Sequence, residues 1–384
     1  MSSQAPTAAP TAPAPTTDWI AVARELGPTF AARAAEHDAT DAFVAENYAE
    51  LKARRVFGAG VPSELGGGGA SYPELCDLLR VLAQHCSSTA LALSMHMHLV
   101  AVNAWRWRHE TAPTDGLLRR VAAEQLVLVS SGGSDWLPGS GTAVRAEGGF
   151  KISGKKVFSS GSPSGQILST CAVFADPASG PTVIHFGVPL GAPGVRMETT
   201  WRALGMRGTG SNDVVLEDVF VPDAAVGVRR PAGKWHSLFH TIASVAFPLI
   251  YAVYVGVAEA ARDLAVKEAG KKKVDPVLLG LVGEMENELY AARLALRDMI
   301  ANAAAPAFGP ATTNTAMMGR TLAGRHSVRT VEKALEVAGG VSFYRALGLE
   351  RRFRDVQGAR FHPLQEKPQG QYAGRIALGL DVDA

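Results

Sequence analysis

The stretch from Ser131 to Gly161 reads SGGSDWLPGSGTAVRAEGGFKISGKKVFSSG, and it decides the class of fold. Short β-branched or alternating runs are separated by Gly, Ser, Pro and Asp, which is typical of strands joined by tight turns. The segment AVRAEGGFKIS predicts a hairpin that turns at Gly148 and Gly149. Runs of the same kind continue from about residue 126 to residue 231, so the middle of the chain is expected to be built of strands.

The segments on both sides of this region are helical in pattern. Apolar residues recur three and four positions apart from about residue 18 to 127, and the same period returns after residue 234. We therefore expect a disordered leader over 1–17, an N-terminal α domain over 18–127, a middle β domain over 128–233 and a C-terminal helical domain over 234–384. A doubly wound fold would alternate strands and helices, so it does not fit.

Composition excludes several classes of protein. The 384 residues carry 38 Lys plus Arg against 36 Asp plus Glu, which leaves no electrostatic footprint for nucleic acid. Three cysteines cannot form a disulfide framework, and the uncharged Ala/Pro/Thr-rich start lacks the basic and apolar regions of a secretory signal, so a cytoplasmic location is expected. Residues 235–258 carry no formal charge, but their histidines and proline favour a buried helix over a membrane span.

Several common motifs are incomplete. Gly139–Gly141 and Gly208–Gly210 lack the third glycine of a dinucleotide-binding fingerprint and lie among predicted strands. A phosphate-loop-like run ends at Lys156, where magnesium binding requires Ser or Thr. His96 and His98 are two positions apart and so face different sides of a helix. No metal site is expected.

Three stretches resemble the acyl-CoA dehydrogenase superfamily of flavoproteins. The sequence SGGSD (131–135) followed by GGFKISGKKVFSSG (148–161) resembles the flavin side of its β domain. The sequence LGMRGTGSNDVVLEDVFVP (204–222) resembles the strand pair that leads out of that domain. The sequence EVAGG (336–340), with LERRFRD (349–355), resembles its C-terminal G-G and E-R-x-x-R-D segment. The three stretches occur in the family's order, and the likeness begins at about residue 18.

This resemblance implies an α+β multi-domain fold with an N-terminal helical domain, a middle β-barrel or sandwich domain and a C-terminal four-helix bundle. It also implies a homotetramer and a bound flavin. Small Gly and Ser turns offer backbone N–H groups to the polar edge of such a ring. The residues expected to contact the flavin are Ser131, Ser134, Phe158, Ser160, Arg207, Ser211, Gly339 and Gly340.

Two features depart from the pattern of the family. Members hold the pyrophosphate of a neighbouring subunit's FAD with an arginine motif and a glutamine; here these regions read as Lys271–Lys273 and Glu336. FAD and FMN therefore both remain candidates. The positions that carry the catalytic glutamate in dehydrogenases fall on Pro363 and Ala246, and Glu366 lies three residues beyond the first of these.

The form F-x-[ST]-G at Phe158–Gly161 is closer to the flavin-dependent monooxygenase branch of the same fold, which takes reduced flavin from a partner reductase. That branch carries histidines matched by His96 and His362. A histidine beside a flavin can deprotonate a phenol or an amine, or donate a hydrogen bond to a bound group. We therefore expect His96 and His362 to converge on one pocket.

These observations favour a flavin-dependent oxidoreductase that acts as a two-component-type monooxygenase or carries out another oxidation outside the usual dehydrogenation. Two alternatives stay open: an acyl-CoA or acyl-carrier-protein dehydrogenase with Glu366 as its base, and a non-catalytic flavin-binding or scaffold protein. The expected partners are a small-molecule or acyl-thioester substrate, a flavin reductase or an electron-transfer flavoprotein, and further copies of the chain. Neither nucleic acid nor a membrane is expected.

Overall fold

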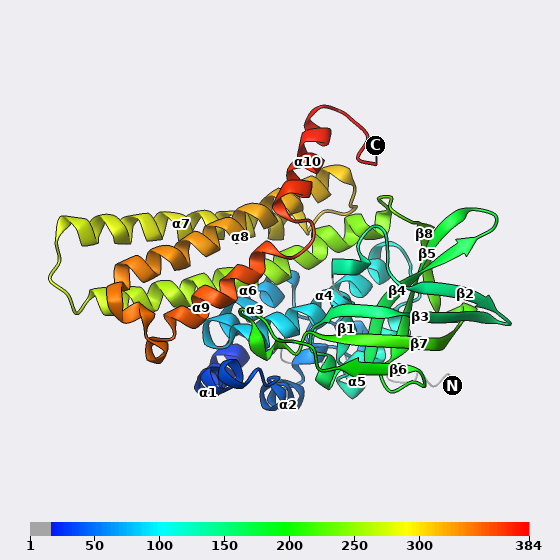
Figure 1. The fold of residues 1–384 in the computed structure, drawn as a ribbon, viewed down its shortest axis with the longest axis horizontal. Helices are drawn as coiled ribbons and strands as arrows, with labels where there is room; N and C mark the ends of the chain where they lie inside the picture. Colours follow the sequence, from blue (N-terminus) through cyan, green and yellow to red (C-terminus); the bar gives the residue numbers. More distant parts are fainter. Residues whose placement is uncertain (1–16, 132, 384) are drawn as a thin grey trace, which may run out of the picture.

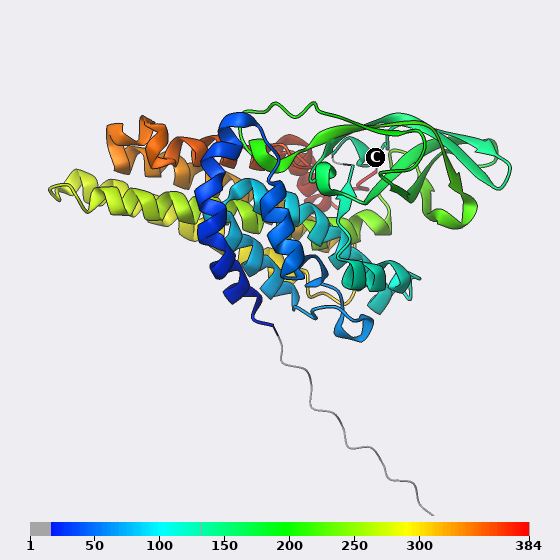
Figure 2. The same ribbon diagram turned by 90° about the horizontal axis from the view of Figure 1, so that it is seen from below.

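The computed structural model describes residues 17–131 and 133–383. Helices come first, then strands, then helices again, which confirms the fold class expected from the sequence. The strands gather at one end of the long axis, and the loop that joins α6 to α7 lies at the other end (Figure 1). The view from below shows the sheet as a layer beside the N-terminal helices (Figure 2).

The N-terminal region consists of helices whose starts are capped by side chains. Asp18 accepts hydrogen bonds from the backbone N–H groups of Ile20 and Ala21, and Ser71 forms a capping box with Glu74. The fourth helix is buried along most of its length because it packs against both the sheet and the C-terminal helices. The helices are α1 (Trp19–Thr40), α2 (Ala45–Ala53), α3 (Tyr72–His85), α4 (Ser87–His109) and α5 (Asp115–Glu124).

The middle region forms one mixed sheet in the order β6-β7-β3-β2-β4-β5-β8, with β1 parallel to β4. Alternate side chains of its strands meet in a single apolar cluster that includes Phe150, Leu168 and Val214. The strands are β1 (Leu128–Ser130), β2 (Thr142–Ala146), β3 (Gly149–Ser159), β4 (Ile167–Asp176), β5 (Gly180–Pro189), β6 (Val195–Glu198), β7 (Asn212–Pro222) and β8 (Val226–Pro231).

The β2–β3 hairpin turns one residue earlier than expected. Ala146 pairs with Gly149, so Glu147 and Gly148 are the two turn residues. Gly148 has a φ of +70°, a conformation that glycine adopts without a steric penalty. The two-residue turn is therefore Glu147-Gly148, with the glycine at its second position.

Three long helices, α6 (Ser237–Ala269), α7 (Pro276–Asn302) and α8 (Pro310–Ala338), build the C-terminal region. The shorter α9 (Leu349–Val356) packs against α6 and α8, and α10 (Glu366–Ala377) packs against α8. Within the described chain, α6 alone is long and apolar enough to cross a membrane, and 94% of its most apolar window is buried by neighbouring helices. Its hydrophobicity is accounted for by its place at the centre of the fold, between α3, α4 and α8.

Candidate active site between the sheet and the helices

A cavity of about 520 Å³ lies where the three regions of the chain meet. Its volume is in the range of small-molecule sites, and its walls are mostly apolar. The N-terminal region contributes one face of α4, the sheet contributes two turns, and the C-terminal region contributes α6 and the segment after α9. The lining residues are Leu91, Met95, Gly133, Trp136, Phe158, Ser160, Trp201, Ala203, Leu204, Gly205, Met206, Ser211, Tyr254, Arg354, Gln357, Gly358, Phe361, His362, Pro363, Leu364 and Gln365.

A buried ion pair anchors the turn that contributes Gly133 and Trp136. Lys156 on β3 has no exposed surface, and its ammonium donates to both carboxylate oxygens of Asp135, at 3.0 and 3.2 Å. It also donates to the carbonyl of Cys171 at 2.6 Å. Buried charges require partners of this kind. The pair therefore fixes the Asp135 end of the turn against the sheet.

The Ser131 hydroxyl serves the same anchor, because it donates to the Asp135 carboxylate. Thr170 donates to that carboxylate as well, at 3.0 Å. Ser131 is not among the residues that line the cavity, so its side chain stabilises the turn. The side chain of Ser134 lies outside the part of the chain that the structure describes.

The second turn follows β3 and presents hydroxyl groups to the cavity. The side chains of Ser160 and Ser211 are buried and 2.7 Å apart, and Thr209 is hydrogen-bonded to Ser211 at the same distance. Phe158 has a φ of +56°, in the left-handed region that is costly for a bulky residue. This conformation places the exposed Phe158 ring at the cavity, edge-on to Trp201 at 5.9 Å.

His362 lines the cavity from the C-terminal side. Its Nε2 lies 2.7 Å from the hydroxyl of Tyr254 on α6. Arg320 donates to the His362 carbonyl at 2.7 Å and so holds the backbone of this segment. Burial, together with the Arg320 guanidinium, lowers the pKa of His362 to about 3. The imidazole is therefore neutral at neutral pH.

His96 does not line the cavity, so the two histidines do not converge on one pocket. Its Nε2 donates to the Phe57 carbonyl at 2.8 Å, and its Nδ1 accepts from the Leu128 N–H at 3.0 Å. Burial lowers the pKa of His96 to about 4. Met95 faces the cavity, and the next residue of a helix is turned by about 100°. His96 consequently links the N-terminal helices to β1.

Glu366 also lies away from the cavity. It begins α10, its side chain is 58% exposed, and it forms an ion pair with Arg325. Pro363 lines the cavity at the position where a dehydrogenase has its glutamate in the ungapped count. Among the described residues that line the cavity there is no Asp or Glu.

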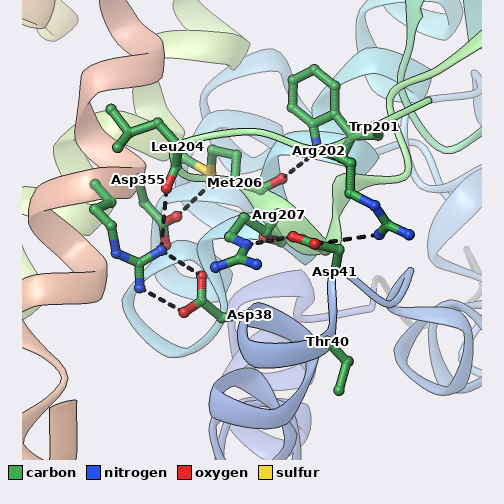
Figure 3. A network of polar contacts seen from close by, with 12 residues as sticks. Asp38, Thr40, Asp41, Trp201, Arg202, Leu204, Met206, Arg207 and Asp355 are labelled. Carbon is green, nitrogen blue, oxygen red and sulfur yellow. Dashed lines mark hydrogen bonds and ion pairs between the residues drawn. The ribbon is translucent and has the colours of Figure 1, made fainter.

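A loop from Trp201 to Met206 closes one side of the cavity, and Figure 3 shows the polar contacts that hold it. The backbone N–H of Met206 donates to Asp355 at 2.5 Å, and the Met206 carbonyl accepts from the Trp201 indole at 3.1 Å. Arg354 donates to the Leu204 carbonyl at 3.2 Å. A Cβ on Gly205 would lie 2.3 Å from the Arg354 carbonyl oxygen, so only glycine permits this close approach.

Charged contacts tie this loop to the end of α1. Arg354 donates to both carboxylate oxygens of Asp38, at 2.6 and 2.8 Å. Arg207 donates to Asp41 (Figure 3). The Arg207 guanidinium, with Arg202, holds the pKa of Asp41 below its usual value. Arg207 therefore supports the loop from outside and does not line the cavity.

Gly339 and Gly340 lie at the end of α8, apart from the cavity-lining residues of the same chain. Lys272 donates to the carbonyls of Val337 and Ala338, both at 2.8 Å, and so caps this helix. Glu336 forms an ion pair with Lys333. These side chains are thus engaged within the chain.

Sequence reasoning missed Trp136, Trp201, Tyr254, Gln357 and Gln365, which also line the cavity. Trp136 directly follows the motif at 131–135, and Trp201 lies three residues before the motif at 204–222, so closeness to a flavin-related motif could have indicated both. Tyr254 lies in the apolar run of α6, where its sequence environment is that of an ordinary core residue.

Comparison with known proteins assigns the chain to a family. The N-terminal, middle and C-terminal domains of acyl-CoA dehydrogenase match residues 21–111, 130–219 and 249–366. The amino sugar nitrososynthase RubN8 of Streptomyces rubradiris is 30% identical over 93% of this chain and 88% of its own length. L-evernosamine nitrososynthase of a Micromonospora strain is 29% identical over 93% of this chain and 89% of its own.

Solved structures agree with this assignment. KijD3 in complex with FMN and a dTDP-3-amino sugar has a TM-score of 0.86 and 28% identity, and the match covers 96% of each chain. An isobutylamine N-hydroxylase of Streptomyces viridifaciens is 28% identical over 80% of this chain and 82% of its own. The chain belongs to the acyl-CoA dehydrogenase superfamily. It is a flavin-dependent oxidoreductase whose relatives include nitrososynthases and monooxygenases as well as acyl-CoA dehydrogenases. The family and the flavin are confirmed, and the nitrososynthases and monooxygenases fit the preference for an oxidation other than dehydrogenation.

Proposed function

We propose that this protein is an FMN-dependent monooxygenase that receives reduced flavin from a separate reductase and transfers one oxygen atom to a small molecule. The observation that carries the proposal is the cavity without a described Asp or Glu. Removal of a proton from the α-carbon of an acyl thioester requires a carboxylate base within reach of the substrate. Because Glu366 is engaged with Arg325 away from the cavity, the dehydrogenase alternative lacks its base.

The residues of the cavity fit a flavin. The paired hydroxyls of Ser160 and Ser211 can bind the polar edge of the ring, and Phe158 and Trp201 offer apolar surface to its faces. The indole Nε1 of Trp136 is buried without a partner among the described residues, so it is a further donor for a bound group. When reduced FMN is bound, it supplies the two electrons that convert dioxygen into water and a transferred oxygen atom.

The chain's own residues then bind the substrate, exclude water and place hydrogen bonds. The apolar walls, with Leu91, Met95 and Leu204 among them, keep solvent from the reacting atoms. The Trp201–Met206 loop closes one side, and the neutral His362 stands at the other.

FMN is preferred over FAD because of the end of α8. Glu336 places a carboxylate where the superfamily pattern has glutamine, and a carboxylate repels a pyrophosphate. Of the three lysines at 271–273, Lys272 is already bonded to the carbonyls that end the helix, and Lys271 is paired with Glu268.

We also propose a homo-oligomer in the cytoplasm. Phe343, Tyr344, Val274 and Val277 are exposed near the end of the helical bundle, and Phe343 is 90% exposed. Apolar side chains gathered in this way are typical of surfaces that another chain covers. Light scattering after gel filtration tests the oligomer.

The proposed location in the cytoplasm is supported by the cysteines. Cys76, Cys86 and Cys171 are free thiols, as expected in a reducing compartment.

The main experiment has two arms. Calorimetric titration with FMN, reduced FMN and FAD is expected to show binding of reduced FMN and weaker binding of FAD. The protein loaded with reduced FMN is then mixed with oxygen and panels of amines, thioethers and acyl-CoA esters, and products are identified by mass. Anaerobic bleaching of oxidised, bound flavin by an acyl-CoA would contradict the proposal and restore the dehydrogenase.

A further inference from the structure

Two buried arginines lie directly behind the wall of the cavity, one on the sheet side and one on the helical side. Arg230 on β8 is 1% exposed and donates to the carbonyl of Trp136 at 2.9 Å. Arg320 on α8 is 3% exposed and donates to the carbonyl of His362 at 2.7 Å. Because Trp136 and His362 both line the cavity, a single residue separates each guanidinium from it.

Neither guanidinium has a carboxylate partner among the described residues. Arg230 donates to carbonyls and to Nε2 of His185 at 3.0 Å, and it lies 4.4 Å from the centroid of the Phe239 ring. Arg320 donates to carbonyls and lies 5.4 Å from the centroid of the Tyr251 ring, while its buried Nε–H has no hydrogen-bond partner. A buried charge without a counter-ion destabilises the folded state, so two of them beside one cavity require a reason.

The charged groups in the surroundings do not cancel this positive charge. Asp135 acts on Arg230, but Asp135 is itself paired with the Lys156 ammonium at 3.0 Å. On the helical side Asp355 is buried, and the arginines at 351–352 act on it from α9. Each nearby carboxylate therefore has at least one further cation of its own.

The titratable groups beside the two arginines are neutral at neutral pH. Arg230, together with burial, lowers the pKa of His185 to about 3, and burial with Arg320 does the same for His362. Burial shifts the pKa of the other groups toward their neutral forms: His98, His236, Cys171, Tyr251 and Tyr254. No Asp or Glu lines the described cavity. The cavity is therefore bordered by a surplus of positive charge.

The wall segments that the two arginines hold lie against each other. A Cβ on Gly133 would lie 3.0 Å from Cγ of Pro363, so the turn that contains Trp136 adjoins the segment that contains His362. The two charges consequently act on the same part of the cavity. Arginine suits this role because its guanidinium stays protonated at every pH at which the protein is folded.

We propose that Arg230 and Arg320 give the cavity a positive potential that stabilises the ring of reduced flavin as an anion, so that the protein selects reduced over oxidised flavin. The reduced ring releases one proton to solvent and keeps its electron pair, and the negative charge stays on the ring. The ring of oxidised flavin is uncharged at neutral pH and gains nothing from the two arginines. Both act as positioning residues through the segments they hold, and the proposal rests on the bound flavin and not on oxygen transfer.

Coulomb's law gives the size of the effect. A unit charge about 10 Å away, in protein with an effective dielectric constant of about 20, changes an ionisation constant by about tenfold. Two such charges make the bound reduced ring about a hundredfold more acidic than free reduced FMN. Tighter binding of the reduced form also raises the midpoint potential, by about 30 mV for each tenfold difference in affinity between the two forms.

The first test uses the wild-type protein. The chain is loaded with reduced FMN without oxygen, and the absorbance of the ring is followed as the pH is changed. We expect the bound ring to ionise about two pH units below free reduced FMN. A bound ring that ionises at the same pH as free reduced FMN, or at a higher one, would overturn the proposal without any variant.

The second test assigns the shift to the arginines. Arg230→Met and Arg320→Met should each move the ionisation of the ring back by about one pH unit, whereas Arg320→Lys keeps the charge and should keep the shift. The matched control is Arg325→Met on the same helix, because the Arg325 side chain is 46% exposed and paired with Glu366, so its charge is screened. If neither Met variant moves the ionisation while both remain folded by circular dichroism, the proposal is wrong.

The third test separates the ring from the phosphate of FMN. Calorimetric titration should show that Arg320→Met weakens binding of reduced FMN by about tenfold and leaves oxidised FMN nearly unchanged, which lowers the midpoint potential by about 30 mV. Equal losses for both forms, with the ring ionising as in the wild type, would mean that the charge serves the phosphate and would overturn the proposal. Absence of any binding of reduced FMN would overturn the proposed function as well, whereas an unshifted ring in a protein that transfers oxygen would overturn this inference alone.

Discussion

Replacing Lys156 by methionine should destabilise the protein more than any surface substitution, and the reason lies in one buried pair. Lys156 is fully buried, and its ammonium lies within hydrogen-bond distance of both Asp135 carboxylate oxygens, of two Ser140 oxygens and of the Cys171 carbonyl. Methionine has a similar length but no charge, so Lys156→Met leaves the Asp135 carboxylate buried without its counter-ion. Loss of one partner of a buried pair costs about 3–5 kcal/mol of unfolding free energy.

The assay is a double-mutant cycle followed by urea denaturation. Asp135→Asn alone should cost about as much, because it leaves the ammonium unpaired. The double variant should cost less than the sum of the two, by at least about 1.5 kcal/mol, because neither charge remains. Calorimetric titration of the same proteins should show FMN affinity falling in each single variant, because Asp135 holds the turn that presents Gly133 and Trp136.

The adjacent Lys155 is the matched control. It lies on the same strand, its side chain is 51% exposed, and it forms ion pairs with Glu198 and Asp213. Exposed pairs contribute about 0–1 kcal/mol, so Lys155→Met should have a small effect. The reasoning is refuted if Lys156→Met costs less than about 1 kcal/mol, or if the two single costs simply add.

Glu366→Gln should leave oxidation activity within about tenfold of the wild type, since Glu366 contacts Arg325 and not the cavity; a loss of 10²–10⁴, typical of a general base, would return the dehydrogenase to consideration. His96→Ala should lower the unfolding free energy at pH 7 by about 2–5 kcal/mol, because the Leu128 N–H and the Phe57 carbonyl lose their partner. Burial lowers the pKa of His96 to about 4, so between pH 6.5 and pH 4 the unfolded chain binds a proton at this residue and the folded chain does not. Over this range the unfolding free energy of the wild type should therefore fall by up to about 3 kcal/mol more than that of His96→Ala. Equal pH slopes of the two proteins would contradict this. Gly205→Ala should weaken FMN or substrate binding and lower the unfolding free energy by about 1–3 kcal/mol in urea titrations, because the new Cβ would lie 2.3 Å from the Arg354 carbonyl oxygen. Gly227→Ala is the control, because there is open space around its Cβ.

Local patterns in the sequence were enough for the order of the domains and for the class of protein. Helical periods, alternating strands and turn residues are short-range properties, and each is legible within a window of ten to twenty residues. The motifs at 131–135 and 158–161 carried the flavin expectation because their turns are local structures as well. The one-residue difference at the β2–β3 hairpin arose because two adjacent glycines, Gly148 and Gly149, offer two registers.

The roles of single side chains depended on contacts between residues that are far apart in the sequence, which a short sequence window does not contain. His96 and Ser131 have residue types that suit an active site, but their partners Leu128, Phe57 and Asp135 use their hydrogen-bonding groups within the fold. Glu366 is close in sequence to the dehydrogenase position, yet the ion pair with Arg325 holds it elsewhere.

By itself, the sequence determined the α–β–α order, the superfamily and the absence of a glutamate at both usual positions, because these are properties of residue type and spacing. The tertiary structure decided which histidine faces the cavity and which tyrosine accompanies it. Tyr254 and His362 are separated by 108 positions, and their hydrogen bond exists only because α6 and the segment after α9 pack together. The direction of a helical side chain changes by about 100° with each residue. Which residues line a cavity between three regions of the chain therefore depends on how the helices pack, and residue type alone does not predict it.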